Sequence, residues 1–285
     1  MPAGPAGLYS RTLGDGPPIV VLHGGPDFDH FYLLPELDRL ADRFRLVYYD
    51  QRGRGRSSPG VEPGEVTLAS ELDDVDSVRR HFGFDRVALL GHSWGGVLAM
   101  EYATRNPHHV SHLILVNTGP ASADDFQVFR DHLLRIRPAG DVERMQAIAA
   151  GAPYQAGDLE AEAEFYRLHF LPTLQQPERL EQLVGRLRAN FTAESVLKAR
   201  AIEQRLYDET WRSDGYDLLP KLRAVQIPTL VLHGEGDFVP VALAAHIAEA
   251  VPRARLTVLP ECGHFAYLEE PDAVHEQVVA LFESA

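Results

Sequence analysis

One serine, Ser93, stands in a setting that could make its hydroxyl a nucleophile. It lies within the pattern G-x-S-x-G at residues 91–95, after the apolar run 87–90 and before a helical pattern that begins at residue 97. This order of strand, turn and helix is the context that a nucleophile elbow requires. The turn holds the serine in a strained backbone conformation, and the helix directs backbone N–H groups and its dipole toward a developing oxyanion.

Two residues far along the chain could activate that hydroxyl. A serine is a poor nucleophile at neutral pH, so it needs a histidine base, and a carboxylate must fix the tautomer of that base. Asp237 lies just past the apolar run 227–234, and His264 lies past the strand-like run 255–259. Because the carboxyl ends of parallel strands meet at one edge of a sheet, Ser93, Asp237 and His264 are predicted to form a catalytic triad there.

Backbone N–H groups near the serine could stabilise the negative charge that forms during attack on a carbonyl. The β-branched run 19–22 ends at His23-Gly24-Gly25-Pro26-Asp27, where paired glycines let bare backbone approach a ligand. We expect the N–H groups of Gly25 and Trp94 to form an oxyanion hole. Loss of one such donor typically removes about 3 kcal/mol of transition-state stabilisation.

The elements that must position these residues alternate between strand and helix. A short edge strand is predicted over residues 8–13, and buried strands follow at 19–22, 44–49, 85–91 and 112–116. Helical spacing of leucines over 33–40 and an apolar stripe over 68–82 indicate helices between the strands. This alternation predicts an α/β fold with a mostly parallel, doubly wound sheet.

The alternation stops after residue 120 and resumes near residue 223. Residues 121–222 show only helical periodicity, which predicts a helical cap, or lid, inserted into a core domain made of residues 1–120 and 223–285. The Gly-rich cationic loop 50–58 lacks the order of a phosphate-binding loop, and its Asp50 and Arg52 are expected to lock the loop structurally.

Composition and charge exclude several classes of function. The 285 residues are 45% hydrophobic and 24% charged, and the net charge of −14 disfavours binding to nucleic acid or to an anionic membrane surface. No signal peptide and no transmembrane run is apparent, and the single cysteine, Cys262, excludes an intrachain disulfide and is expected to serve packing. A cytoplasmic protein without a metal or other cofactor is therefore predicted. The oligomeric state is left open.

Several segments together resemble the proline iminopeptidases, which are serine aminopeptidases of the α/β-hydrolase fold. They are H-G-G-P at 23–26, D-Q-R-G-x-G-R-S at 50–57, G-x-S-W-G at 91–95, Asp237, and Gly263-His264. The resemblance covers both halves of the sheet and barely extends to the cap. It implies that Ser93 attacks the first peptide carbonyl, that His264 carries the proton, that Asp237 orients His264, and that Gly25 and Trp94 bind the oxyanion.

The chain also departs from the pattern of that family. A glycine usually follows H-G-G-P, but Asp27 stands there, and Phe238 follows Asp237 where one branch has an acid. Selectivity of the family for a free amine rests on glutamates from the cap or near the triad. Glu203 and Glu209 are the candidates here, with Phe238 as a third possible substrate-binding residue.

The predicted function is hydrolysis of a small amide through an acyl-enzyme, with release of an N-terminal residue from a short peptide. A carboxylesterase or lactonase would use the same three residues, since fold and triad do not choose the acyl substrate. A third possibility is a receptor that retains the triad mainly to bind a small molecule.

Overall fold

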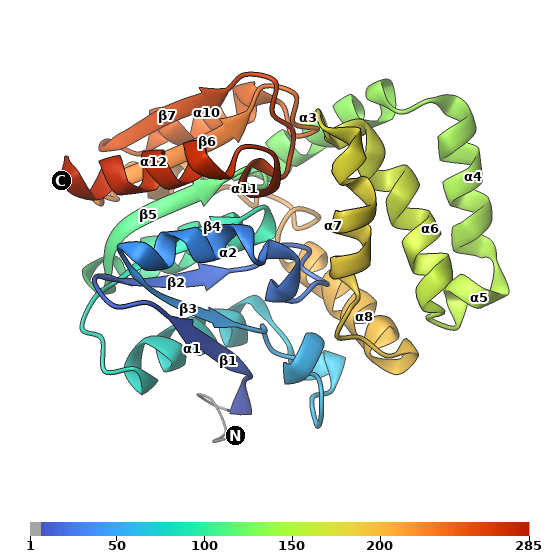
Figure 1. Ribbon diagram of the computed structural model, residues 1–285, viewed down its shortest axis with the longest axis horizontal. Coiled ribbons are helices and arrows are strands. Elements are labelled where there is room, and N and C mark those ends of the chain that lie inside the picture. The colour runs from blue at the N-terminus through green and yellow to red at the C-terminus, as the bar shows by residue number, and fades with distance from the viewer. Residues whose placement is uncertain (1–6, 285) are drawn as a thin grey trace.

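A seven-stranded sheet forms the centre of the computed structural model, which describes residues 7–284 (Figure 1). Its strands are β1 (Ser10–Leu13), β2 (Pro18–Leu22), β3 (Arg45–Tyr49), β4 (Val87–His92), β5 (Val110–Val116), β6 (Thr229–Gly234) and β7 (Ala254–Leu259). Their spatial order is β1-β3-β2-β4-β5-β6-β7, with β1 antiparallel to β3 and every other pair parallel. The predicted α/β fold with a mostly parallel, doubly wound sheet is confirmed.

Both faces of the sheet are buried, and successive residues of a strand serve opposite faces. In β2, Val20 and Leu22 belong to one hydrophobic cluster, whereas Ile19 and Val21 belong to the other. This arrangement explains why the central strands are continuous apolar runs instead of alternating polar and apolar residues. The polar residues that follow these strands therefore mark the strand ends clearly in the sequence.

Helices cover the two faces as the clusters require. The first face packs α1 (Leu68–His81), α2 (Trp94–Arg105) and α10 (Val241–Ala250), and the second packs α12 (Pro271–Glu283). A one-turn helix, α11 (Ala266–Glu269), joins the loop after β7 to α12. Thr67 caps α1 as part of a capping box with Ser70.

The helix expected over residues 33–40 is instead a pair of 3₁₀ helices, His30–Leu33 and Glu36–Asp42. Pro35 separates them because proline has no N–H for a helical hydrogen bond and disfavours the α conformation of the residue before it. Leu37 and Leu40 nevertheless pack on the sheet. The leucine spacing thus predicted the buried face but not the type of helix.

The segment between β5 and β6 contains only helices among its regular elements. They are α3 (Ala123–Ile136), α4 (Ala139–Ala150), α5 (Ala152–Gln155), α6 (Leu159–Phe170), α7 (Leu180–Leu187), α8 (Ala193–Glu209) and α9 (Leu219–Leu222), with 3₁₀ turns at Leu171–Thr173 and Pro177–Arg179. Figure 1 shows α4 to α8 beyond the carboxyl ends of the strands. We propose that residues 121–222, here called the cap, act as the lid predicted from the sequence.

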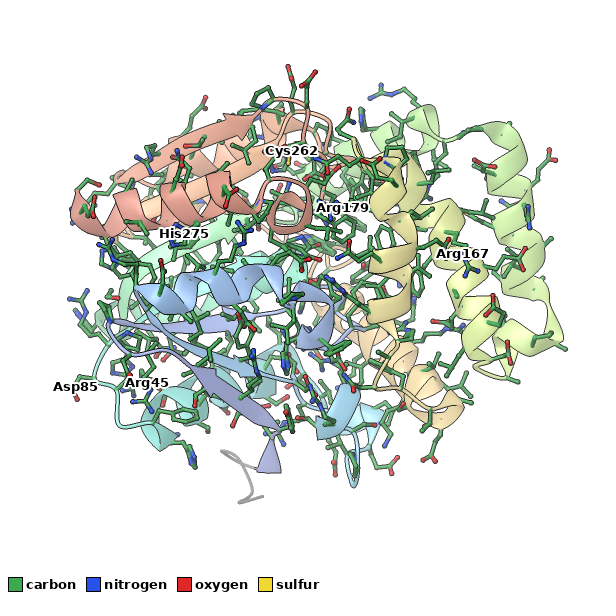
Figure 2. All side chains as sticks on the ribbon, in the orientation of Figure 1. Arg45, Asp85, Arg167, Arg179, Cys262 and His275 are labelled. Carbon is green, nitrogen blue, oxygen red and sulfur yellow. The ribbon has the colours of Figure 1, made fainter. Side chains whose placement is uncertain are left out.

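Side chains fill the space between the sheet and its helices (Figure 2). Cys262, in the loop after β7, is fully buried in the second cluster, and burial raises the pKa of its thiol. It is therefore a packing residue and not a second nucleophile. Among residues 7–284, no helix is long and apolar enough to cross a membrane. The N-terminal stretch that was expected to hold no signal peptide lies mostly within residues 1–6, outside the described residues.

Candidate active site

Ser93 occupies a sharp turn between β4 and α2. Its φ of 54° is in the left-handed region, which a non-glycine residue rarely adopts. A side chain on Gly91 would collide with the backbone of Gly95, and one on Gly95 would collide with the carbonyl of Leu22. The two glycines of G-x-S-x-G are therefore required by close backbone contact, and the strained turn presents Ser93 at the end of the central strand.

Asp237 and His264 are brought together by the loops after β6 and β7. The Nδ1 atom of His264 lies 2.9 Å from Oδ1 of Asp237, and both side chains are buried. Burial alone would raise the pKa of Asp237. His264, His233 and the hydrogen bonds that Asp237 accepts instead hold that pKa below its ordinary value. An ionised Asp237 fixes the proton of His264 on Nδ1 and leaves Nε2 able to accept another.

Asn117, which follows β5, supports this pair. Its Nδ2 donates to Oδ2 of Asp237 at 2.8 Å and to the carbonyl of Gly263 at 2.9 Å. Asn117 has a left-handed backbone conformation, with a φ of 46°, and its side chain points toward Asp237 and Gly263. It holds Asp237 and the loop of His264 in fixed relation.

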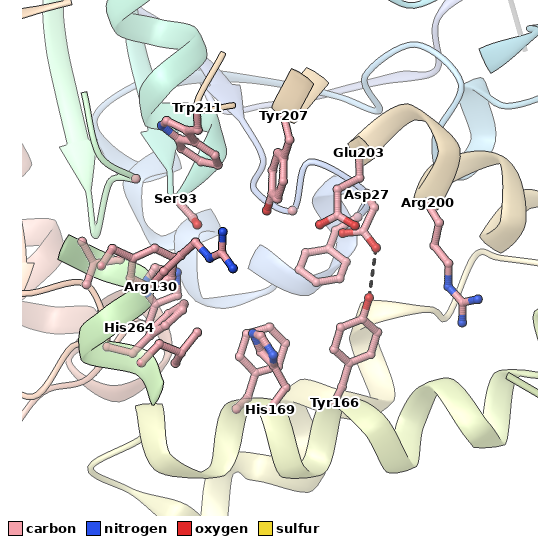
Figure 3. Close-up of a pocket in the computed structure, with 18 of the residues that line it drawn as sticks. Asp27, Ser93, Arg130, Tyr166, His169, Arg200, Glu203, Tyr207, Trp211 and His264 are labelled. Atoms are coloured by element: carbon pink, nitrogen blue, oxygen red, sulfur yellow. Dashed lines mark hydrogen bonds between the residues drawn. The ribbon is translucent and has the colours of Figure 1, made fainter. Parts of the chain in front are cut away.

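Ser93 and His264 line one cavity of about 660 Å³ beneath the cap (Figure 3). No hydrogen bond joins their side chains in the part of the chain that the structure describes. Catalytic hydrogen bonds often form or shorten only when substrate binds, so the lack of a hydrogen bond between Ser93 and His264 is compatible with proton transfer in a substrate complex. Phe238 also lines the cavity, and its ring centroid lies 4.3 Å from that of His264. It shields the histidine from water.

The two proposed oxyanion donors come from different elements. Gly25 lines the cavity, with a φ of 118° that favours glycine. Trp94 is the first residue of α2, so its N–H has no acceptor within the helix. The indole of Trp94 is buried against Trp211, which directs only its backbone toward the site.

His92, beside the nucleophile, links the two sides of the site through its ring. Its Nε2 lies 2.9 Å from the carbonyl of His264 and therefore donates to it, while Nδ1 accepts from the hydroxyl of Tyr32 at 2.7 Å. Tyr32 accepts in turn from the N–H of Gly24 at 2.8 Å. Burial lowers the pKa of His92 to about 3, so it is neutral and serves as a connector.

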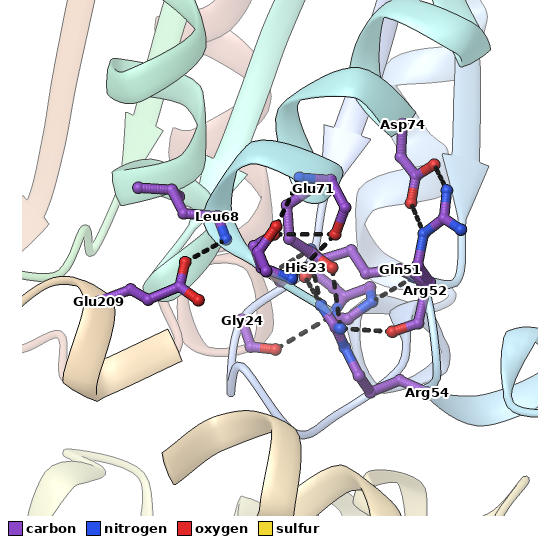
Figure 4. Close-up of polar contacts among 11 residues, drawn as sticks. His23, Gly24, Gln51, Arg52, Arg54, Leu68, Glu71, Asp74 and Glu209 are labelled. Atoms are coloured by element: carbon purple, nitrogen blue, oxygen red, sulfur yellow. Dashed lines mark hydrogen bonds and ion pairs between the residues drawn. The ribbon is translucent and has the colours of Figure 1, made fainter. Parts of the chain in front are cut away.

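Buried polar contacts anchor the loop 50–58 to the end of β2 (Figure 4). Gln51 donates its backbone N–H to Nε2 of His23 at 3.0 Å and its side-chain amide to the carbonyl of His23 at 2.9 Å. Arg54 binds Gln51 and forms a fully buried ion pair with Glu71 at 2.6 Å. Two further pairs hold the same loop, His30 with Asp50 and Arg52 with Asp74. This loop is structural, as its sequence suggested.

A second buried charge network joins the cap to the segment after Gly25. Arg188 pairs with Asp27 and, at 2.9 Å, with Glu162, and Arg200 also pairs with Glu162. Tyr166 donates its hydroxyl to Asp27 at 2.9 Å (Figure 3). Two carboxylates are thus matched by two guanidinium groups.

Glu203, from α8, lines the same cavity but has no such match. Among residues 7–284, no cationic side chain lies within ion-pair distance of its carboxylate. Burial raises the pKa of Glu203 to about 8, and the nearby charge of Asp27 contributes to the rise, whereas Arg188, the hydroxyl of Tyr207 and Arg212 oppose it. Figure 3 shows Glu203 and Asp27 on the same side of the cavity.

The structure does not bring Glu209 to the cavity, which corrects its candidacy as a substrate-binding residue. Its carboxylate accepts from the backbone N–H of Leu68 at 2.8 Å, at the start of α1, and pairs with Arg205. Glu209 lies six residues after Glu203, which is more than one helical turn and on another face of α8. Figure 4 shows its contact with Leu68.

A model of the alpha/beta hydrolase fold family matches residues 17–271. The chain belongs to the alpha/beta hydrolase fold family. This hydrolase is 28% identical over 277 residues to a proline iminopeptidase of Saccharolobus solfataricus, covering 95% of this chain and 86% of the relative. It is equally identical over 282 residues to a proline iminopeptidase of Lactobacillus delbrueckii subsp. lactis, covering 95% and 92%. The resemblance stated from the motifs is therefore confirmed.

The fold of a solved relative agrees with this assignment. The crystal structure of a proline iminopeptidase from Mycobacterium smegmatis superimposes on the hydrolase with a TM-score of 0.70 and 25% identity, covering 97% of this chain and 94% of that one. Within residues 7–284, no group of three or more His, Cys, Asp or Glu side chains could hold a metal ion.

Sequence reasoning missed Asn117 and the Asp27–Arg188 network of this hydrolase. Asn117 follows a predicted strand at the same sheet edge as Ser93, so its position was an available signal. Asp27 follows Pro26 directly and stood out only as a departure from the family. Arg188 could not be found, because no local pattern tells which residue of a long helical segment will meet a loop of the core.

Proposed function

We propose that this hydrolase is a serine aminopeptidase that releases the N-terminal residue of short peptides. Ser93 attacks the carbonyl carbon of that residue while His264, oriented by Asp237, accepts the hydroxyl proton. The N–H groups of Gly25 and Trp94 stabilise the oxyanion. His264 then protonates the leaving amine, and a water molecule, activated by the same histidine, hydrolyses the acyl-enzyme.

The unmatched carboxylate of Glu203 is the observation on which the choice of substrate rests. The half-buried carboxylate of Glu203 has no ion-pair partner, and burial and the charge of Asp27 outweigh the more distant charges of Arg188 and Arg212, so its pKa is raised to about 8. The ammonium group of a peptide N-terminus would supply the missing charge. An ester or lactone without an amine would leave Glu203 unmatched, so the cavity favours a free-amine substrate over these alternatives. The names of the relatives support the same choice.

The test compares aminoacyl-p-nitroanilides, including prolyl-p-nitroanilide, with N-acetylated nitroanilides, p-nitrophenyl esters and lactones. We expect free-amine anilides to have the highest kcat/KM, and Ser93→Ala to lower it by about 10⁴-fold or more for every substrate. Rapid turnover of esters or lactones with no free-amine substrate cleaved would overturn the proposal. A receptor would instead show one turnover at most.

A matched pair of variants separates recognition from catalysis. Glu203→Gln removes the charge from the cavity, and we expect kcat/KM for free-amine anilides to fall at least tenfold while ester hydrolysis falls much less. Glu209→Gln, on the same helix but outside the cavity, is the control and should leave the ratio between the two substrate classes unchanged.

A further inference from the structure

The wall of the cavity near His264 contains a cation that nothing in the described residues neutralises. Arg130, from α3, lines the cavity. Arg130 is exposed at the mouth of the cavity, and its guanidinium group forms no hydrogen bond or ion pair with any residue in the range 7–284. In Figure 3 it projects into the cavity on the side of Ser93, away from Glu203 and Asp27.

His169, from α6, adds a second donor near the same wall. Arg137 donates to Nδ1 of His169 at 2.6 Å, and a guanidinium cannot accept a hydrogen bond, so the proton of the neutral ring must be on Nε2. Burial, together with the charges of Arg137 and His264, keeps the pKa of His169 well below its ordinary value. The ring lines the cavity, and its centroid lies 6.1 Å from that of Phe238, the residue that contacts His264.

The mechanism determines which part of a peptide faces this wall. His264 must protonate the leaving amine, so the leaving residue lies on the His264 side of the scissile bond. The N-terminal ammonium lies on the opposite side of that bond, toward Glu203. In a dipeptide, the leaving residue carries its free carboxylate a single Cα from its nitrogen.

We infer that Arg130, assisted by the fixed N–H donor of His169, binds the carboxylate of the leaving residue and makes free dipeptides the preferred substrates. This inference rests on the proposed aminopeptidase function and adds the identity of the leaving group to it. A guanidinium can bind a carboxylate through two parallel hydrogen bonds, which gives both charge and geometric selection.

The experiment measures one ratio in several variants. The substrates are a dipeptide, such as prolyl-alanine, and its C-terminal amide, prolyl-alaninamide, which differ at the carboxylate. For the unmodified enzyme we expect kcat/KM of the free acid to exceed that of the amide at least tenfold, mainly through KM. In Arg130→Ala this ratio should fall toward one, with partial retention in Arg130→Lys. Arg135 is exposed like Arg130 and lies on the same helix, but it does not line the cavity, so Arg135→Ala should leave the ratio unchanged.

The outcomes separate this inference from the function on which it rests. A ratio that is the same in Arg130→Ala and in the unmodified enzyme overturns the carboxylate subsite, even if both peptides are cleaved. Failure of the enzyme to cleave either peptide, while esters are hydrolysed, overturns the aminopeptidase function itself. Glu203→Gln serves as a further control, because it should slow both peptides by a similar factor and leave their ratio intact. Since the comparison is between variants, the different leaving abilities of acid and amide cancel.

Discussion

At the scale of single residues, the site depends on groups that orient others. Asp237 accepts hydrogen bonds from His264 and Val239 through one oxygen and from Asn117 through the other. Nearly every acceptor position of this buried carboxylate is therefore occupied. A carboxylate held in this way stays ionised and keeps the imidazole in one tautomer, which is what general-base catalysis by His264 needs.

Removal of the Asn117 side chain should slow catalysis without large loss of fold. We expect Asn117→Gly, which tolerates the positive φ, to lower kcat about tenfold with little change in KM, since a hydrogen bond to a charged group contributes about 1.5–3 kcal/mol. Steady-state kinetics on the best anilide measures this.

A second variant distinguishes positioning from packing. Asn117→Asp places a negative charge beside the Asp237–His264 pair, which favours the protonated form of the pair, so the acidic limb of the kcat/KM profile should move to higher pH. An unchanged profile would show that Asn117 acts through packing alone.

The raised pKa of Glu203 has a consequence for the pH dependence of stability. Its pKa of about 8 in the folded protein exceeds the ordinary value, so between these two values the folded state binds more protons than the unfolded state. Stability therefore falls as pH rises through this window. We expect Glu203→Gln to raise the melting temperature more at pH 8 than at pH 5, as measured by calorimetry. Equal effects at both pH values would mean that the folded protein does not shift this pKa.

At the scale of elements, the segment after β2, which carries Gly25, depends on the loop 50–58 through His23. The ion pair between Arg54 and Glu71 is fully buried, and loss of one partner leaves the other charge without compensation. We expect Arg54→Met to lower the free energy of unfolding by about 3–5 kcal/mol in urea titrations. Arg54→Met combined with Glu71→Leu should recover much of this loss. Additive losses in the double variant would contradict the assignment.

Much of the core was predictable from the sequence, because it depends on local signals. The strands predicted at 19–22 and 85–91 are mainly β-branched or apolar runs with a glycine at or near their ends. They form as Pro18–Leu22 and Val87–His92, and parallel pairing brings their ends to one edge. The 3₁₀ helices at 30–42 were not foreseen, because leucine spacing does not distinguish them from an α-helix when a proline interrupts it. Glu203 and Glu209 looked alike in the sequence. Only the packing of α8 decides which of them faces the cavity.

At the scale of the whole molecule, the cap and the core are joined by buried charge. Arg188 donates hydrogen bonds to the backbone carbonyl and to the carboxylate of Asp27, so a residue of the cap holds the segment that follows Gly25. The limits of the cap at 121 and 222, and the cytoplasmic location inferred from composition, stay predictions. The helical character of that segment follows from its periodicity, whereas its contacts with the core do not.

Loss of the ion pair between Arg188 and Asp27 should affect both stability and turnover. We expect Arg188→Met to lower the free energy of unfolding by about 3–5 kcal/mol, because it leaves Asp27 buried without its cation, and to lower kcat. Arg167→Met is the control. Arg167 also lies on the cap, but its pairs with Glu160 and Glu181 are exposed, so the loss should stay below about 1 kcal/mol. Equal losses in the two variants would contradict the role given to Arg188.

The contact between Arg188 and Asp27 also bears on how the protein would discriminate among substrates by size. An oversized group pressed against the helices above the cavity would pull on a segment only two residues from the Gly25 amide. We expect bulky ligands to bind and yet react slowly, because they would displace the N–H of Gly25 from the substrate oxygen that becomes negatively charged. A larger substrate would then slow the chemical step more than it weakens binding.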